Sequence, residues 1–390
     1  MSRTTDRTAA IAGLGITELG KVYGRSASQF AADAVQRATA DAGLQLGDLD
    51  GLIVSGGLDD SVDLNMQGRL GLTDLKLFTQ MNAYGSTAGQ MVQYAAMAVQ
   101  SGMAETIAVV WADAPLKEKV GGSAAYAGKT AQTPAGWQAI TGSSGIISAN
   151  MMYALAARRH MDTYGTTSEQ LGSVAVAQRA WAGLNPLAQL RDPITLADHQ
   201  SSRMISDPLH LLDCCLVSNG GIALIITTTE RAKNLPQPPV GVLGWGQGHP
   251  GRTSIRNNQF GLSTGAAISG PAALTMAGVS LADIDVVELY DCYTYTALVT
   301  LEDYGFCAKG EGGEFVSDPG MLGPDGKLAL NTGGGQLSSY YMWGMTPLSE
   351  AVIQARGQAG ERQVPQHDRV LVSGNGGVVD YHSTLVLGTV

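Results

Sequence analysis

The sequence has few charged residues, and most of them are acidic. Only 15% of its 390 residues are charged, with 24 lysines and arginines against 34 aspartates and glutamates, and the formal net charge is −10. Nucleic acids and anionic membrane surfaces attract proteins of the opposite charge, so we expect neither as a partner. No apolar run approaches the roughly 18 residues that a membrane-spanning helix requires, which excludes an integral membrane protein.

Cysteine and histidine are also scarce. The four cysteines have no regular spacing and two of them, Cys214 and Cys215, are adjacent. This pattern is unlike a disulfide framework and indicates a reducing compartment. The six histidines are scattered, and the CxxC and HExxH patterns of metal sites are missing, so we expect no metal. The opening segment lacks the apolar stretch of a secretory signal, and we expect a cytoplasmic protein.

What the sequence does contain is an alternation of short apolar runs and amphipathic segments. Residues 8–19 and 105–114 are typical of buried strands, and residues 86–102 of a helix. Residues 28–44 form a second helical pattern, with Ser28 as a possible N-cap and Gly43 as its stop. Strands that alternate with helices predict an α/β protein built on parallel strands.

An internal repeat divides the chain. "LGDLDGLIVSGG" (46–57) and "LADIDVVELYDC" (281–292) share one order of residues, and each leads into an expected strand. A turn rich in small residues follows in each half, "NAYGSTAGQ" in the first and "NTGGGQLSSYYMWG" in the second. We therefore predict two βαβ halves, 1–235 and 236–390, that face each other across a cleft. The irregular helical stretch at about 112–215 is predicted to be an inserted loop domain.

Three tyrosines crowd around one cysteine in the second copy of the repeat. Tyr290, Tyr293 and Tyr295 surround Cys292 at the mouth of the expected strand, although the chain has only 13 tyrosines. Tyrosine packs well at half-buried edges, so a dimer seam is one explanation. A catalytic cluster of phenols is the other.

The chain resembles the thiolase superfamily over essentially its whole length, most closely the sterol-carrier-type thiolases. The resemblance rests on five segments in order: "GITELGK", "YGTTSEQLGSVAVAQRAWAGLNPLAQ", "ISDPLHLLDCCLVSNGGIALIITT", "DVVELYDCYTYTALVTLEDYGF" and "NTGGGQLSSYYMWGMTPLSEA". It implies a thiolase-like fold, in which two repeated halves form α/β/α/β/α layers and carry an inserted loop domain.

The residues with which a thiolase performs acyl transfer are replaced. The nucleophilic cysteine at the start of a helix falls on Gly85, or on Tyr84 if the alignment shifts by one residue. The two histidines of the family correspond to Tyr290 and Tyr341. Cys292 alone remains, at a position where sterol-carrier-type thiolases keep an acid/base cysteine.

These replacements match the thiolase-like steroid side-chain aldolases. The resemblance implies cleavage of a 17-hydroxy steroid acyl-CoA into a 17-ketosteroid and propionyl-CoA, with no cofactor other than the coenzyme A of the substrate. It also implies a homodimer and a small partner with an OB-fold and a zinc ribbon. Tyr290 and Tyr341 are the acid/base candidates, Tyr293, Tyr340 and Cys292 are further catalytic candidates, and Gly85, Tyr84, Asn331, Gly334 and Gly335 are the substrate-binding candidates. Gly85 is expected to leave room for a branched acyl chain.

Two other functions stay open at this point. Cys292 would act as a nucleophile in an ordinary thiolase or acyltransferase, and a covalent acyl-enzyme would then form. Alternatively, the chain is a catalytically silent acyl-CoA or lipid carrier that supports another subunit. One member of the Tyr340–Tyr341 pair is expected to be structural, because adjacent side chains diverge at a turn.

Overall fold

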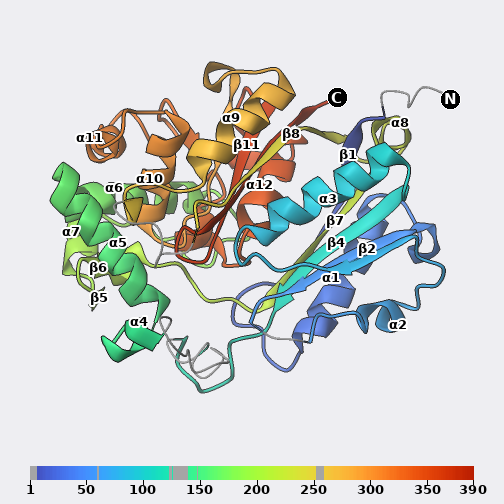
Figure 1. The fold of residues 1–390 in the computed structure, drawn as a ribbon, viewed down its shortest axis with the longest axis horizontal. Helices are drawn as coiled ribbons and strands as arrows, with labels where there is room; N and C mark the ends of the chain where they lie inside the picture. Colours follow the sequence, from blue (N-terminus) through green and yellow to red (C-terminus); the bar gives the residue numbers. More distant parts are fainter. Residues whose placement is uncertain (1–6, 59–60, 123–124, 126–138, 147, 252–258) are drawn as a thin grey trace.

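The computed structural model describes residues 7–58, 61–122, 125, 139–146, 148–251 and 259–390. Ten strands form one large sheet in the order β10-β9-β11-β12-β8-β1-β7-β4-β2-β3 (Figure 1). They are β1 (Ala9–Ile16), β2 (Gly51–Gly56), β3 (Leu77–Gln80), β4 (Thr106–Asp113), β7 (Gly220–Thr228), β8 (Val240–Gly248), β9 (Val286–Glu288), β10 (Ala329–Leu330), β11 (Arg369–Gly376) and β12 (Tyr381–Thr389).

The sheet consists of two copies of one five-stranded arrangement. The orders β1-β7-β4-β2-β3 and β8-β12-β11-β9-β10 have the same pairing: two antiparallel contacts and then two parallel ones. The copies join at β1 and β8, where Ala10 is opposite Gly241. The predicted duplication is therefore present, and the two repeated sequence segments lead into β2 and β9.

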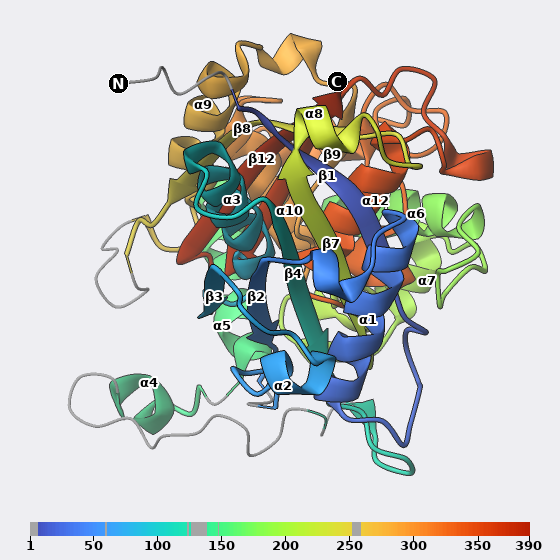
Figure 2. The same ribbon diagram turned by 90° about the vertical axis from the view of Figure 1, so that its right-hand side faces the viewer.

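Helices cover the sheet in layers. Two of them, α3 (Thr87–Ser101) and α12 (Met345–Ala355), contact strands of both copies and lie between them. On the outer faces, α1 (Ala27–Asp41) packs on the first copy, and α9 (Ala266–Ala277) packs on the second with α10 (Thr294–Tyr304) beside it. Figure 2 shows α1 and α3 on opposite sides of the strands between them. The expected α/β/α/β/α layering is confirmed.

The ends of α1 and α3 follow from local sequence. α1 begins one position after Ser26, whose side chain accepts a hydrogen bond from the backbone N–H of Gln29, so the N-cap is Ser26 and not Ser28 as the sequence suggested. α3 ends at Gly102, which has a left-handed φ of 73°. Most residues of α3 are buried on every face of the helix, as a helix between two layers requires.

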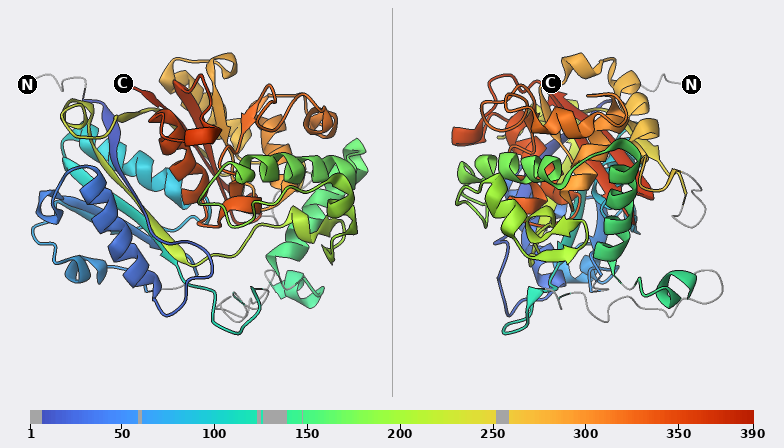
Figure 3. Two further views of the ribbon diagram at one scale, coloured as in Figure 1. Left: turned by 180° about the vertical axis from the view of Figure 1, so that it is seen from behind. Right: turned by 90° about the vertical axis from the view of Figure 1, so that its left-hand side faces the viewer.

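The segment between β4 and β7 contains the expected inserted helices. They are α4 (Ala139–Ser143), α5 (Ala149–Tyr164), α6 (Ser168–Gly183) and α7 (Leu196–Ser201), followed by the small pair β5 (Met204–Ser206) and β6 (Leu209–His210). α6 packs on α10 and on α11 (Gly312–Ser317), so the insertion lies against the second copy (Figure 3). Residues 123–124, 126–138 and 147 of the expected loop domain lie outside the described part.

Two short helices, α2 (Met66–Leu70) and α8 (Thr229–Ala232), complete the α-helices of the described part. The half boundary at residue 235, between α8 and β8, stays a prediction. In the described part of the chain, every helix is too short or too polar to cross a bilayer.

Candidate active site

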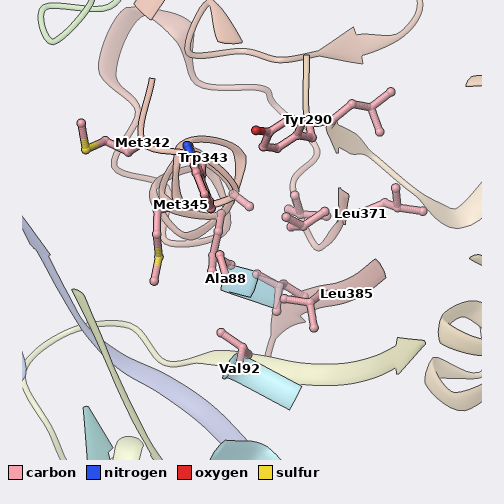
Figure 4. Packing of buried hydrophobic residues seen from close by; sticks show 14 of the residues in the cluster. Ala88, Val92, Tyr290, Met342, Trp343, Met345, Leu371 and Leu385 are labelled. Atoms are coloured by element: carbon pink, nitrogen blue, oxygen red, sulfur yellow. The ribbon is translucent and has the colours of Figure 1, made fainter. Parts of the chain in front are cut away.

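The hydroxyl groups of Tyr290 and Tyr341 meet at 3.1 Å. Tyr290 follows β9, and Tyr341 stands in the connection that leads into α12. Figure 4 shows Tyr290 among the buried apolar side chains, together with Trp343 and Leu371. Tyr290 is only 4% exposed, whereas Tyr341 is partly exposed, so Tyr341 is the member of the pair that solvent contacts more. The structure thus brings together the two residues that the resemblance matched to the family's histidines.

The ring of Tyr290 fills the space beside Gly85. An ideal Cβ atom added at Gly85 would lie 2.3 Å from Cε2 and Cζ of Tyr290, and 2.2 Å from the backbone oxygen of Asn375. No side chain fits there while the phenol is in place. The expectation that Gly85 makes room for an acyl chain is therefore corrected, because the volume is occupied by the Tyr290 ring.

Tyr84, the residue before Gly85, has a strained backbone at the start of α3. Its φ is 52°, and Trp343 has a φ of 49° at the corresponding place before α12. The two rings lie 6.0 Å apart between centroids, and Tyr84 also stacks on Tyr381 at 6.2 Å. Tyr84 is 45% exposed, so its phenol ring is available to a ligand. Of the two positions considered for the lost nucleophile, Tyr84 is the one whose positive φ recurs in the second half, at Trp343.

The further candidates Tyr293 and Tyr340 form hydrogen bonds with residues outside the Tyr290–Tyr341 pair. The hydroxyl of Tyr293 donates to Oδ1 of Asn150 on α5, and burial raises the pKa of Tyr293. The hydroxyl of Tyr340 lies 2.9 Å from Oγ of Ser349 on α12, and burial raises the pKa of Tyr340 as well. Both phenols therefore serve as anchors between elements in this structure.

Cys292 is buried beside the phenols. Its side chain is 4% exposed, and burial raises the pKa of the thiol to about 12. A thiol with that pKa is protonated at neutral pH, and the thiolate is the form that attacks a thioester. The thiol of Cys214 is also protonated at neutral pH, because burial raises its pKa to about 12. Burial thus disfavours a cysteine nucleophile at these two positions.

The glycine turn after β10 is built around Asp291. Both carboxylate oxygens of Asp291 accept a hydrogen bond from the backbone N–H of Gln336, at 2.9 and 3.0 Å. An ideal Cβ atom at Gly335 would lie 2.1 Å from Asp291 Oδ2, and Gly334 has a left-handed φ of 93°. Gly335 therefore makes room for the carboxylate, whereas a Cβ atom at Gly334 would lie 2.5 Å from Cβ of Ala182 on α6. Both contacts differ from the substrate contact expected from sequence. Burial raises the pKa of Asp291 to about 7.

Asn331 begins this turn and has a structural contact. Its φ is 50°, and its Oδ1 accepts the backbone N–H of Leu289 at 2.6 Å. Asn331 therefore ties the turn to the strand segment that precedes Tyr290.

Tyr153 is a site neighbour that sequence reasoning missed. It comes from α5 in the insertion, its ring centroid lies 4.5 Å from that of Tyr293, and its hydroxyl donates to the backbone oxygen of Gly377 at 2.6 Å. Its position in an amphipathic helical segment gave no signal of function, because such a tyrosine is usually a packing residue. The insertion thus contributes directly to the wall of the site.

Among the described residues, no group of three His, Cys, Asp or Glu side chains is placed to hold a metal ion.

Comparison with known proteins agrees with this architecture. The model of the "Thiolase C-terminal domain-like" family matches residues 246–389. A steroid side-chain-cleaving aldolase of Thermomonospora curvata is 40% identical, over 97% of this chain and 97% of its own. A 17-hydroxy-3-oxo-4-pregnene-20-carboxyl-CoA lyase of Mycobacterium tuberculosis is 36% identical, over 97% of this chain and 99% of its own.

A solved structure extends the likeness to three dimensions. An Ltp2-ChsH2(DUF35) aldolase superposes with a TM-score of 0.87 and 38% identity, and the match covers 98% of each chain. The resemblance drawn from the sequence is confirmed by these findings. The chain belongs to the thiolase superfamily, on the branch that contains the steroid side-chain-cleaving aldolases.

Proposed function

We propose that this protein is a carbon–carbon lyase that cleaves a β-hydroxy acyl-CoA by a retro-aldol reaction. The substrate is a 17-hydroxy steroid with a three-carbon CoA thioester side chain, and the products are a 17-ketosteroid and propionyl-CoA. The observation that carries the proposal is the contact between Tyr290 and Tyr341, with the Tyr290 ring seated beside Gly85. The named activities of the two relatives support the same chemistry.

The reaction needs one base and one acid, and the two phenols supply both. One phenolate takes the proton of the substrate hydroxyl, and the bond between the ring carbon and the side chain breaks. Its electron pair becomes the enolate of the thioester, and a phenol returns a proton to carbon. A hydrogen bond from the neighbouring phenol stabilises a phenolate, so the pair can share one charge. No covalent intermediate and no redox step are required.

Partners are part of the proposal. A small subunit with an OB-fold and a zinc ribbon is the proposed partner, in keeping with the two-component name of the similar solved structure. A homodimer is proposed as well. Strand β3 lies at the end of the sheet with its outer edge unpaired among the described residues, and such an edge is suited to a symmetric contact.

The deciding experiment is turnover of a defined thioester. The protein and its partner are incubated with the 17-hydroxy steroid thioester, and ketone and propionyl-CoA are followed by mass spectrometry. Tyr290→Phe and Tyr341→Phe are expected to lower kcat by about 100- to 10,000-fold, the range typical of a lost acid or base. Tyr304→Phe is the control, because this buried phenol bonds Thr384 on another part of the sheet at 2.7 Å. Full activity of either site variant removes that residue from the mechanism.

The two other functions give different results in the same assay. An acyltransferase that uses Cys292 would yield an acyl-enzyme visible as a mass increase of the intact protein. A silent carrier would bind the thioester without forming ketone, even with the partner present.

A further inference from the structure

The short segment 374–377, with the sequence Gly-Asn-Gly-Gly, packs against the start of α3. An ideal Cβ atom at Gly376 would lie 2.1 Å from the backbone oxygen of Ala83. One at Gly374 would lie 3.0 Å from the backbone oxygen of Gly85. The segment is therefore built for close backbone approach, and Asn375 is its only residue with a side chain.

The amide of Asn375 is buried without a partner. The residue is 1% exposed, and neither Oδ1 nor Nδ2 has a hydrogen-bond partner within the described part of the chain. A buried amide in this state costs folding free energy, and asparagine is also a poor strand former. An apolar residue would serve the fold better at this position. The amide must therefore be explained by something other than folding.

The backbone of Asn375 lies close to Gly85 and to the ring of Tyr290. Its backbone oxygen lies 2.2 Å from the point where a Cβ atom of Gly85 would stand, and two ring atoms of Tyr290 lie 2.3 Å from the same point. Bond lengths keep the amide nitrogen of an asparagine within about 5 Å of its own carbonyl oxygen. The unpartnered amide is thus no more than one side-chain length from the place where Tyr290 meets Gly85.

We propose that Nδ2 of Asn375 donates a hydrogen bond to the thioester oxygen of the substrate. This inference rests on the proposed retro-aldol function. When the carbon–carbon bond breaks, its electron pair moves into the thioester and places negative charge on that oxygen as the enolate forms. A fixed neutral donor inside a buried site stabilises such an oxyanion more than it stabilises the uncharged thioester. The proton of the substrate hydroxyl goes to a phenolate of the pair, and Asn375 itself transfers no proton.

The test uses Asn375→Leu, because leucine has nearly the shape of asparagine and no hydrogen-bonding atoms. The expected result is a kcat lower by about 100-fold or more, with a much smaller change in KM. The reason is that the hydrogen bond from Nδ2 to the thioester oxygen strengthens in the transition state. The melting temperature of the free protein is expected to stay the same or to rise, because the variant removes an unsatisfied buried amide. Asn375→Ala is measured in parallel as a variant that cannot overpack the site.

Asn219→Leu is the matched control. Asn219 is also 1% exposed, but its Oδ1 accepts from Leu116 N at 2.7 Å and its Nδ2 donates to the oxygens of Val22 and Leu116. Its replacement is expected to lower the melting temperature.

The outcomes separate the two proposals. If the wild-type protein with its partner cleaves the thioester and Asn375→Leu does so at the same kcat, the role of Asn375 is overturned and the lyase function stands. A melting temperature that falls as far as in Asn219→Leu also overturns it, because the amide is then a structural group. A wild-type protein that forms no ketone overturns the lyase function instead.

Discussion

The two halves of the sheet have the same scaffold but different chemistry. In the first half, the side chain of Asp50 accepts the backbone N–H of Thr106 at 2.8 Å. In the second half, Asp285 accepts the N–H of Arg369 at 2.9 Å in the same place of the repeat. Each aspartate lies one residue before a strand, β2 or β9, and binds the first residue of the neighbouring strand, β4 or β11. These bonds therefore set the alignment of β2 with β4 and of β9 with β11.

Five residues beyond each aspartate, the halves diverge. The first half has Ser55 and Gly56 where the second has Tyr290 and Asp291. One copy therefore supplies Tyr290, which we propose as an acid/base residue, and the carboxylate that shapes the turn. The other copy supplies Gly85, whose missing side chain leaves space for the Tyr290 ring. The comparison shows that the two copies of a duplicated fold can supply different parts of one contact, here an aromatic ring and the space that it fills.

The largest expected effect concerns a buried charge layer that the first half lacks. Glu288 stands where the first half has Ile53, and its neighbour Glu350 is paired with Arg362 at 2.8 and 3.0 Å. Arg362→Met leaves a buried carboxylate without its partner, and the free energy of unfolding is expected to fall by about 3–5 kcal/mol. Urea denaturation measures the change.

Glu288→Gln is the companion variant for this layer. Burial and the nearby Glu350 raise the pKa of Glu288, which favours the neutral form of its side chain, so an amide is expected to replace it with little change. A loss below about 1 kcal/mol is expected. Equal losses in Arg362→Met and Glu288→Gln would contradict this account of the layer.

The second prediction concerns a side chain added at Gly85, where the Tyr290 ring lies. Gly85→Ala places a Cβ atom against Tyr290 and is expected to move the phenol, which lowers kcat by about 100-fold or more. Gly68→Ala is the control, because a Cβ atom at this helical glycine of α2 meets nothing within 4 Å. Alanine there is expected to add about 0.5–1 kcal/mol of stability. An active Gly85→Ala protein would show that the ring position does not matter.

The third prediction concerns Asp291, which replaces a glycine of the first half. Burial raises its pKa to about 7, above the roughly 4 of an unfolded chain. The folded state keeps this proton between about pH 4 and pH 7 while the unfolded state loses it. The stability due to the neutral form is therefore complete below pH 4 and is lost as the pH rises through 7, with a slope of at most about 1.4 kcal/mol per pH unit.

Asp291→Asn cannot titrate, so its unfolding free energy is expected to lack this decline. Urea unfolding of both proteins at several pH values measures the difference. Parallel curves for the two proteins would refute the shifted carboxylate.

The smallest effect is expected at Cys292. Its thiol stays protonated near neutral pH, so Cys292→Ala is expected to change kcat by no more than about threefold. The loss of one small buried group is expected to cost about 1 kcal/mol. Loss of most activity would instead favour a catalytic thiol at Cys292, and the proposal that phenols replace the cysteine chemistry of a thiolase would be weakened.

The features that sequence predicted are those with a local pattern. The repeat and the layered fold depend on short motifs, and both are found in the structure. The motifs also singled out Tyr290 and Tyr341, which the structure brings into contact, while their catalytic role stays a prediction. The contacts of Tyr153, Asn375 and Gly85 were not predictable, because they join elements far apart in the chain. The resemblance placed the missing nucleophile at Gly85, or at Tyr84 with a shift of one residue, but could not show that the Tyr290 ring lies against Gly85.

The fit of Tyr290 beside Gly85 also limits how the protein can be divided. A fragment that contains only the second half would carry both of the proposed acid/base tyrosines, but Gly85, against which the Tyr290 ring lies, belongs to the first half. Two separately produced fragments would therefore regain turnover only after reassociation. The position of the Tyr290 ring beside Gly85 would show whether the two fragments had reassociated correctly.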